Sequence, residues 1–313
     1  MLSLLGGIFL GWSLGANDVA NVFGSAVSSR MVKFWTAAVL ASIFVLLGAL
    51  LEGQAGIETL QGLTDLSLKK AVISSVAAAV TVTIMTILGL PVSTSQAVVG
   101  AILGVGILSK HVNVAGLEKV IVCWLGTPVG GFIVAIFLYK LMAAIYNRLP
   151  VDLFEGDMLI RSGLIVAGSY AAYALGANNV ANVTAVFVGA GRLSVFGATL
   201  IGGLSIALGI LTFSRGVMET VGRKLVRLDP FSALIVVLAE AVTVHFYTVV
   251  GVPVSTSQAV IGAILGVGIV KGISTVNRRT LLNILIGWFL TPVIAGVISL
   301  SLFIIVHLQY VPV

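Results

Sequence analysis

A polar Ser-Thr-Ser-Gln motif interrupts very apolar sequence at residues 93–96 and again at residues 255–258. Its hydroxyl and amide groups donate hydrogen bonds but carry no net charge. Each copy stands at the expected start of a helix, where backbone N–H groups are free and the positive end of the helix dipole points outward. This combination suits an oxyanion, and the absence of an arginine fork favours one that is released again. The predicted anion site contains Ser93, Thr94, Ser95, Gln96, Ser255, Thr256, Ser257 and Gln258; the plainer alternative is ordinary N-capping by Ser93 and Ser255.

A second polar motif also occurs twice, as GANDVANV at residues 15–22 and GANNVANV at residues 176–183. Asn and Asp compete for backbone hydrogen bonds, so we expect locally unwound chain with free carbonyl groups here. Carboxylate, amide and carbonyl oxygens suit a small hard cation such as Na⁺, and Asp18 could instead carry a proton. The alternative is that the amides only hold helices together. The predicted cation site contains Asn17, Asp18, Asn21, Asn178, Asn179 and Asn182, with Na⁺ at Asp18, Asn21 and Asn182.

Together the two motifs favour transport of an anion with a cation. An oxyanion held in a low-dielectric site without lysine or arginine needs other positive charge, and each helix N-terminus supplies only about half a charge. A cation at Asp18 would supply the rest. A passive anion channel would not need Asp18, so dependence on a cation gradient separates these classes. We do not expect an enzyme, because the sequence has no H-E-x-x-H or G-x-S-x-G catalytic motif and no nucleotide-binding loop. No cofactor is expected beyond the coupling ion.

Two further ionisable residues lie within apolar sequence. Glu240 and His245 share one predicted helix, and they are functional candidates because charge inside a membrane is costly. A proton or cation relay is one interpretation, and satisfaction by neighbouring helices is the other. Their spacing puts them about 140° apart on a helix, so they need not meet.

Composition identifies an integral membrane protein. Of the 313 residues, 59% are hydrophobic and only 9% are charged, with a mean hydropathy of +1.18. A soluble fold could not bury so much apolar surface. The net charge of +6 is therefore assigned to loop lysines and arginines facing the cytoplasm, and not to a nucleic-acid surface.

The chain consists of two copies of one unit. Residues 91–107 and 253–269 are identical at sixteen of seventeen positions, and prolines at 91 and 253 are expected to break the chain between helices. This predicts an all-helical polytopic membrane protein of two inverted repeats, 1–149 and 158–313, joined by a cytoplasmic linker at 150–157, with discontinuous helices at the repeat interface. The predicted membrane segments are 2–29, 34–53, 71–90, 94–109 and 120–146, then 162–190, 193–214, 231–251, 256–270 and 281–308.

The loops have an uneven distribution of positive charge. With an external N-terminus and five crossings in each half, 12 of the 17 basic residues lie inside and 5 lie outside, as the positive-inside rule requires. Both termini are therefore predicted to be extracellular. An odd number of crossings inverts the second repeat relative to the first. If the segments flanking each Ser-Thr-Ser-Gln motif are re-entrant hairpins, we expect this parity argument to weaken.

The sequence resembles the inorganic phosphate transporter (PiT) family of sodium– or proton–phosphate symporters. The resemblance rests on GANDVANVFGSAVSS at 15–29, GANNVANV at 176–183 and the two Pro-Val-Ser-Thr-Ser-Gln stretches, and it covers essentially the whole chain. It implies import of inorganic phosphate across the cell membrane, with Na⁺ as the first choice of coupling ion. It also implies external termini, surrounding lipid and, in many members, a homodimer. Asn17 and Asn178 would join the two Ser-Thr-Ser-Gln motifs in holding phosphate.

Three departures from the family pattern affect these expectations. Asn179 stands where the second motif usually has Asp, Gln96 and Gln258 stand where many members have His, and Val45 and Val237 stand where animal relatives have Glu. Fewer carboxylates leave the number and identity of the coupling ions open. They also leave open sulfate, or another tetrahedral oxyanion, as the substrate.

Overall fold

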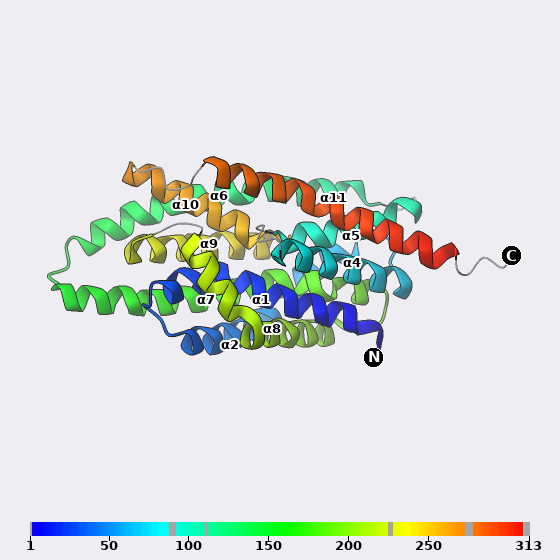
Figure 1. The fold of residues 1–313 in the computed structure, drawn as a ribbon, viewed down its shortest axis with the longest axis horizontal. Coiled ribbons are helices and arrows are strands. Elements are labelled where there is room, and N and C mark those ends of the chain that lie inside the picture. The colour runs from blue at the N-terminus through cyan, green and yellow to red at the C-terminus, as the bar shows by residue number, and fades with distance from the viewer. Residues whose placement is uncertain (1, 88–91, 110–111, 225–227, 273–277, 309–313) are drawn as a thin grey trace.

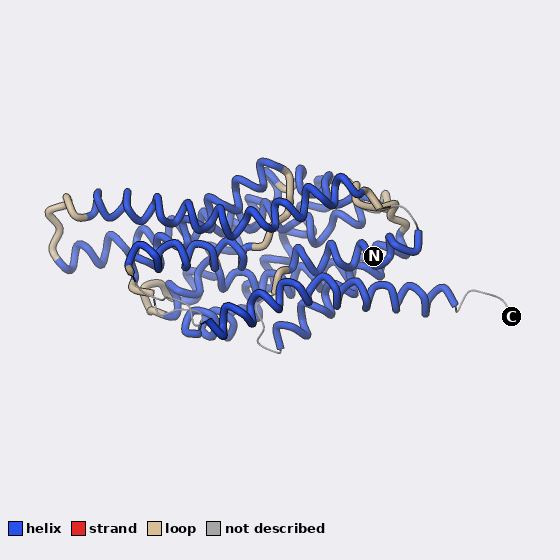
Figure 2. Tube along the Cα trace, turned by 90° about the horizontal axis from the view of Figure 1, so that it is seen from above, coloured by secondary structure: helices blue, strands red, loops and turns tan. Residues whose placement is uncertain are grey.

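The computed structural model describes residues 2–87, 92–109, 112–224, 228–272 and 278–308. Within them every extended regular element is a helix, as Figure 2 shows. After a short 3₁₀ turn at Leu2–Leu4, the helices are α1 Leu5–Ser28, α2 Phe34–Glu52, α3 Gln54–Gln61, α4 Leu68–Ile87, α5 Thr94–Ser109, α6 Val114–Tyr146, α7 Leu153–Gly189, α8 Val195–Lys224, α9 Pro230–Val250, α10 Thr256–Lys271 and α11 Arg278–Leu308.

The helices confirm the predicted all-helical membrane fold. Each of the ten predicted segments corresponds to one helix, and seven helices in the described ranges are long and apolar enough to cross a membrane. Two details differ from the prediction. The short helix α3 replaces part of an expected loop, and α7 begins inside the expected linker because Asp152 and Glu155 form a capping box at its start.

The chain is broken at the second Ser-Thr-Ser-Gln motif as predicted. Pro253 lies between α9 and α10, while Pro91 lies outside the described residues, as do Lys110 and Arg227 from the charge count. Figure 1 shows α4 and α5 in one half of the long axis and α9 and α10 in the other, so each pair forms a hairpin with its tip near the centre. Three long helices then remain in each half. Three is also an odd number, and the inversion of the second repeat stays a prediction.

The helices form one bundle that mixes the repeats, with two smaller groups packed on it. The bundle contains α1, α2, α7 and α8 (Figure 1). One group contains α4, α5 and α11 and contacts the bundle mainly through α4 and α1, while the other contains α6, α9 and α10 and contacts it mainly through α9 and α7. Helices exchange partners between the halves of the sequence: α1 packs along α8 and α7 along α2, while α5 packs along α11 and α10 along α6. The two halves of the chain are therefore intertwined.

Glycines of the Gly-Ala-Asn motifs allow two of these crossings to be close. A Cβ atom at Gly15 would lie 2.0 Å from the carbonyl oxygen of Ile206 on α8, and a Cβ at Gly176 would lie 2.0 Å from that of Val45 on α2. Gly15 therefore serves contact between two backbones. The matching contacts show that both halves use the same crossing.

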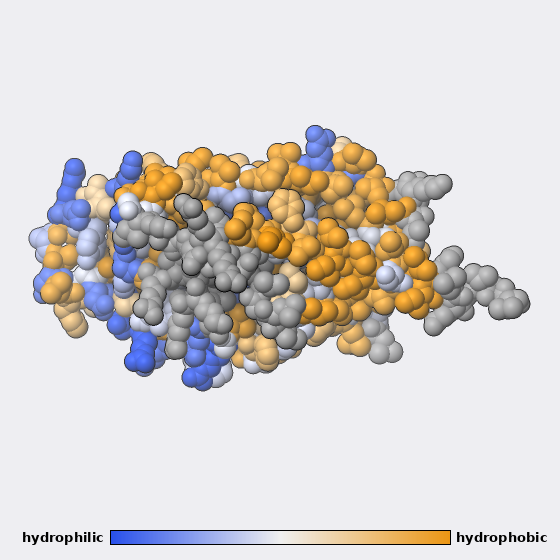
Figure 3. All heavy atoms as spheres, turned by 45° about the horizontal axis from the view of Figure 1, so that its top comes forward, coloured by the Kyte–Doolittle hydropathy of each residue, from blue (hydrophilic) through white to orange (hydrophobic). Residues whose placement is uncertain are grey.

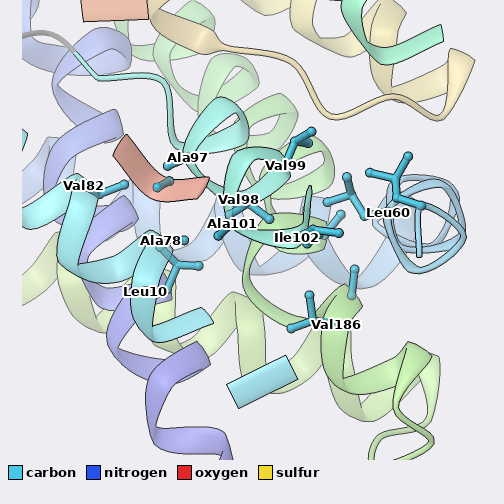
Figure 4. Close-up of a cluster of buried hydrophobic side chains, with 14 of the residues drawn as sticks. Leu10, Leu60, Ala78, Val82, Ala97, Val98, Val99, Ala101, Ile102 and Val186 are labelled. Atoms are coloured by element: carbon cyan, nitrogen blue, oxygen red, sulfur yellow. The ribbon is translucent and has the colours of Figure 1, made fainter. Parts of the chain in front are cut away.

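An apolar core surrounds each hairpin. Figure 4 shows Leu10 of α1, Leu60 of α3 and Val186 of α7 meeting side chains of α4 and α5, including Ala78 and Ile102. These residues are buried. The hairpin α4–α5 is thus held by apolar contacts on several sides, and its tip can be positioned without polar groups along its length.

The surface has the polarity of a membrane protein. Large apolar side chains are exposed along α2, α6 and α11, among them Trp35, Phe137 and Phe289. Figure 3 shows hydrophilic residues gathered mainly at one end of the molecule. The start of α1 and the end of α11 lie at the opposite end (Figure 1). If both termini are extracellular, as predicted, the hydrophilic end faces the cytoplasm.

Gly15→Ala is expected to destabilise the fold because its Cβ would meet the Ile206 carbonyl oxygen, forcing two helix backbones apart. Overpacking of this kind costs about 1–3 kcal/mol or more. Gly216→Ala in α8 is the matched control, since a Cβ there would meet nothing within 4 Å. Thermal unfolding in detergent measures both. Equal unfolding temperatures for the two variants would contradict the backbone contact.

Candidate functional site

Reciprocal hydrogen bonds join the tips of the two hairpins. The Ser95 hydroxyl donates to the carbonyl oxygen of Val254 (2.9 Å), and the Ser257 hydroxyl donates to that of Val92 (3.2 Å). Each helix start is therefore fixed to the loop that precedes the other. Because the same contact occurs in both directions, the N-termini of α5 and α10 are held close together at the centre of the protein.

Both helix starts are capped as predicted. The backbone N–H of Gln96 donates to Ser93 Oγ and that of Gln258 donates to Ser255 Oγ, each at 3.3 Å. Capping satisfies only part of the free N–H groups of a helix start. The remaining groups and the helix dipoles give this region a positive potential without a basic side chain.

The two threonines of the turns keep hydroxyl groups for another ligand. Thr94 Oγ1 is buried beside the Asp18 carboxyl group and has no other hydrogen-bond partner among the described residues. Thr256 Oγ1 accepts a hydrogen bond from Asn21 Nδ2 at 3.2 Å, so its own O–H can donate elsewhere. These hydroxyls are the most available anion donors in the two turns.

The second Gly-Ala-Asn motif clamps the hairpins from α7. Asn178 holds the α9–α10 loop: its Nδ2 donates to Thr248 Oγ1 (3.1 Å) and to the Val252 carbonyl oxygen (3.2 Å), while its Oδ1 accepts from the Val254 N–H (2.8 Å). Asn182 reaches the other tip by donating to Ser95 Oγ at 2.9 Å. One motif thus contacts both hairpins, and sequence reasoning missed Thr248 as its partner.

The first motif places Asp18 beside the same tips. Its side chain is only 4% exposed. Asn17 lies on the same turn, partly buried. The expectation of unwound chain here is wrong, because α1 and α7 are continuous helices through both motifs. Their backbone carbonyls are used in helix hydrogen bonds, so any cation ligands must come from side chains.

Several buried oxygens around the tips have no donor. Gln96 Oε1, Gln258 Oε1 and Asn182 Oδ1 are buried without a hydrogen-bond partner in the described part of the chain, whereas Asn179 Oδ1 accepts from Asn182. Over the same residues, no three His, Cys, Asp or Glu side chains gather as a metal site. A cation here would therefore be held by one carboxylate with amide and hydroxyl oxygens, which suits Na⁺ better than a transition metal.

Glu240 and His245 belong to different clusters. Glu240 is buried near Asp18. His245 instead forms hydrogen bonds of 2.8 Å with Glu52 of α2 and Tyr170 of α7, and Tyr173 donates to the same glutamate. The pair does not form a direct relay. The sequence could not reveal this second cluster, because its members come from three separated helices.

Comparison with known proteins decides the family. The sequence matches the phosphate transporter family over residues 14–299. The chain belongs to the phosphate transporter family. A relative from Methanocaldococcus jannaschii, provisionally named a phosphate permease, is 30% identical over 95% of both chains. The sulfate permease CysP of Bacillus subtilis is also 30% identical, over 96% of this chain and 86% of its own. These relatives are permeases and not enzymes, as predicted.

The fold is also that of a solved transporter. A solved structure described as "The sodium-dependent phosphate transporter" superposes with a TM-score of 0.89 over 98% of each chain at 25% sequence identity. The family and the all-helical membrane architecture predicted from the sequence are therefore confirmed.

Asn178→Ala is expected to loosen the α9–α10 loop, because it removes three buried hydrogen bonds worth about 0.5–1.5 kcal/mol each. Hydrogen exchange at the Val254 amide, which is bonded to Asn178 Oδ1, should become faster. Thr248→Val removes only one of the three bonds and should leave that amide better protected. Unchanged exchange in Asn178→Ala would show that the clamp does not hold the loop.

Proposed function

We propose that this chain is a secondary active transporter that imports inorganic phosphate by symport with Na⁺ across the cell membrane. The observation that carries the proposal is the meeting of two helix N-termini with a buried carboxylate and amide oxygens at the centre of the protein. Anion donors and cation ligands thus occupy one site. The inverted repeat, external termini and homodimer remain predictions that accompany it.

The anion is bound by neutral donors in this proposal. No lysine or arginine lies within seven residues of any motif residue along the chain. Free N–H groups, the Thr94 and Thr256 hydroxyls and two helix dipoles supply the attraction. Such a site binds an anion without the permanent charge pair that would slow its release.

Buried amide oxygens that lack a hydrogen-bond donor favour phosphate over sulfate as the substrate. Phosphate near neutral pH keeps at least one P–OH group that can donate a hydrogen bond, and sulfate has none. Gln96 Oε1 and Gln258 Oε1 are buried acceptors that lack a donor among the described residues, and a protonated phosphate would satisfy one of them. The likeness to a sulfate permease makes sulfate the second candidate.

The cation is assigned to Asp18 and its amide neighbours. A passive anion channel would gain nothing from a buried carboxylate beside its filter, since a negative charge there opposes anion binding. Na⁺ is preferred to a proton because Thr94 Oγ1 lies beside Asp18 and further buried oxygens without a donor lie in the same motifs, whereas a proton needs only one oxygen. The similar solved transporter is also described as sodium-dependent.

Thr94→Val and Thr256→Val are expected to weaken phosphate binding, because each removes a hydrogen bond to a charged ligand worth about 1.5–3 kcal/mol. Thr81→Val is the matched control, since its buried hydroxyl donates only to the Ala77 carbonyl of its own helix. Binding calorimetry with phosphate, and with sulfate as competitor, measures the effect. Wild-type phosphate affinity in both turn variants would reject this site, and tighter binding of sulfate would make it the substrate.

Asp18→Asn is expected to abolish accumulation of phosphate driven by a Na⁺ gradient while leaving a polar side chain of similar shape. The measurement is uptake of radiolabelled phosphate into proteoliposomes with a Na⁺, K⁺ or pH gradient. Accumulation in this variant with unchanged Na⁺ dependence would remove Asp18 from the coupling mechanism.

A further inference from the structure

Glu240 is a buried acid that the anion site does not use. It is 1% exposed on α9, and its Oε2 has no hydrogen-bond partner among the described residues. A buried carboxylate oxygen without a partner is unfavourable. Protonation alone does not remove the problem, because a carboxylic O–H also needs an acceptor within hydrogen-bond reach.

Glu240 lies at the same depth as Asp18. Asp18 is ten residues before the end of α1 and Glu240 is ten residues after Pro230, so each is about 15 Å along its helix. Those two helix ends lie at the same end of the molecule (Figure 1). The two helices are in contact, and the carboxyl groups are close enough to interact electrostatically. Two like charges in this setting require either positive charge between or beside them or protonation of one of the two groups.

The internal repeat shows that packing does not require this acid. Residues 77–82 are AAAVTV and residues 239–244 are AEAVTV, so Ala78 occupies the position in α4 that Glu240 occupies in α9. Ala78 is fully buried in the apolar core (Figure 4). Conversely, Asp18 in the first half corresponds to Asn179 in the second. Each half therefore contributes one buried acid, from a different helix.

We propose that Glu240 binds a second coupling cation, separate from the one at Asp18. This inference rests on the proposed symport function. A Na⁺ ion would bind the unpartnered Oε2 of Glu240 and offset the charge of Asp18 nearby. Water can complete the oxygen shell of the ion. In the second half, the acid that would bind the cation thus lies on α9 and not in the Gly-Ala-Asn motif.

The test compares wild type with Glu240→Gln, Glu240→Ala and Glu58→Gln in proteoliposomes. Glu58 is an exposed glutamate paired with Gln54 and is the matched control. The ratio of ²²Na⁺ to radiolabelled phosphate taken up should fall by about one ion in both Glu240 variants. Wild type and Glu58→Gln should both exchange internal for external phosphate. Adding Asn179→Asp to Glu240→Gln should restore the lost ion.

Binding of ²²Na⁺ to purified protein in detergent provides a measurement independent of transport. Wild type should bind about one more Na⁺ than Glu240→Gln at saturation. Equal ²²Na⁺ binding, or an unchanged flux ratio, would overturn the inference, as would loss of a coupled proton in place of Na⁺. Failure of wild type itself to exchange phosphate would instead overturn the proposed function.

Discussion

The reciprocal hydrogen bonds between the two hairpin tips are the contact on which the rest of the site depends. Ser95 binds the loop before α10 and Ser257 binds the loop before α5, so neither helix start can move without the other. The clamp by Asn178 and the contact of Asn182 fix this pair of tips to α7. In the proposed site, α1 and α7 carry the candidate cation ligands, and the starts of α5 and α10 carry the candidate anion donors.

Charge balance explains why the anion and cation sites coincide. Two helix N-termini together supply about one positive charge, which matches at most a singly charged anion. Buried carboxylates next to them would repel that anion unless each holds a cation. If Asp18 and Glu240 each bind a cation, as proposed, anion binding becomes conditional on cation binding, and this would couple the two. A site built from arginines would bind phosphate more tightly but would not need the cation.

Local sequence patterns predicted much of the fold and part of the site. The repeated apolar segments, the capping serines and the break at Pro253 depend on neighbouring residues, so they could be read directly. Other features join residues that are far apart in the sequence. Helices exchange partners between the two halves of the chain. Asn178 contacts Thr248, 70 positions away, and Glu52 contacts His245, 193 positions away. Nothing in a single sequence fixes such distances. The expectation of unwound Gly-Ala-Asn motifs failed because Gly15 serves a helix crossing, which local propensity does not reveal.

The central claim is that one anion is held between the starts of α5 and α10 without a basic side chain. X-ray diffraction at the arsenic absorption edge, from crystals grown with arsenate and Na⁺, locates a tetrahedral phosphate analogue directly. The account predicts one anomalous peak between Thr94 and Thr256, with arsenate oxygens about 3 Å from backbone nitrogens of both helix starts. A peak beside only one helix start, or beside a lysine or arginine, would contradict it.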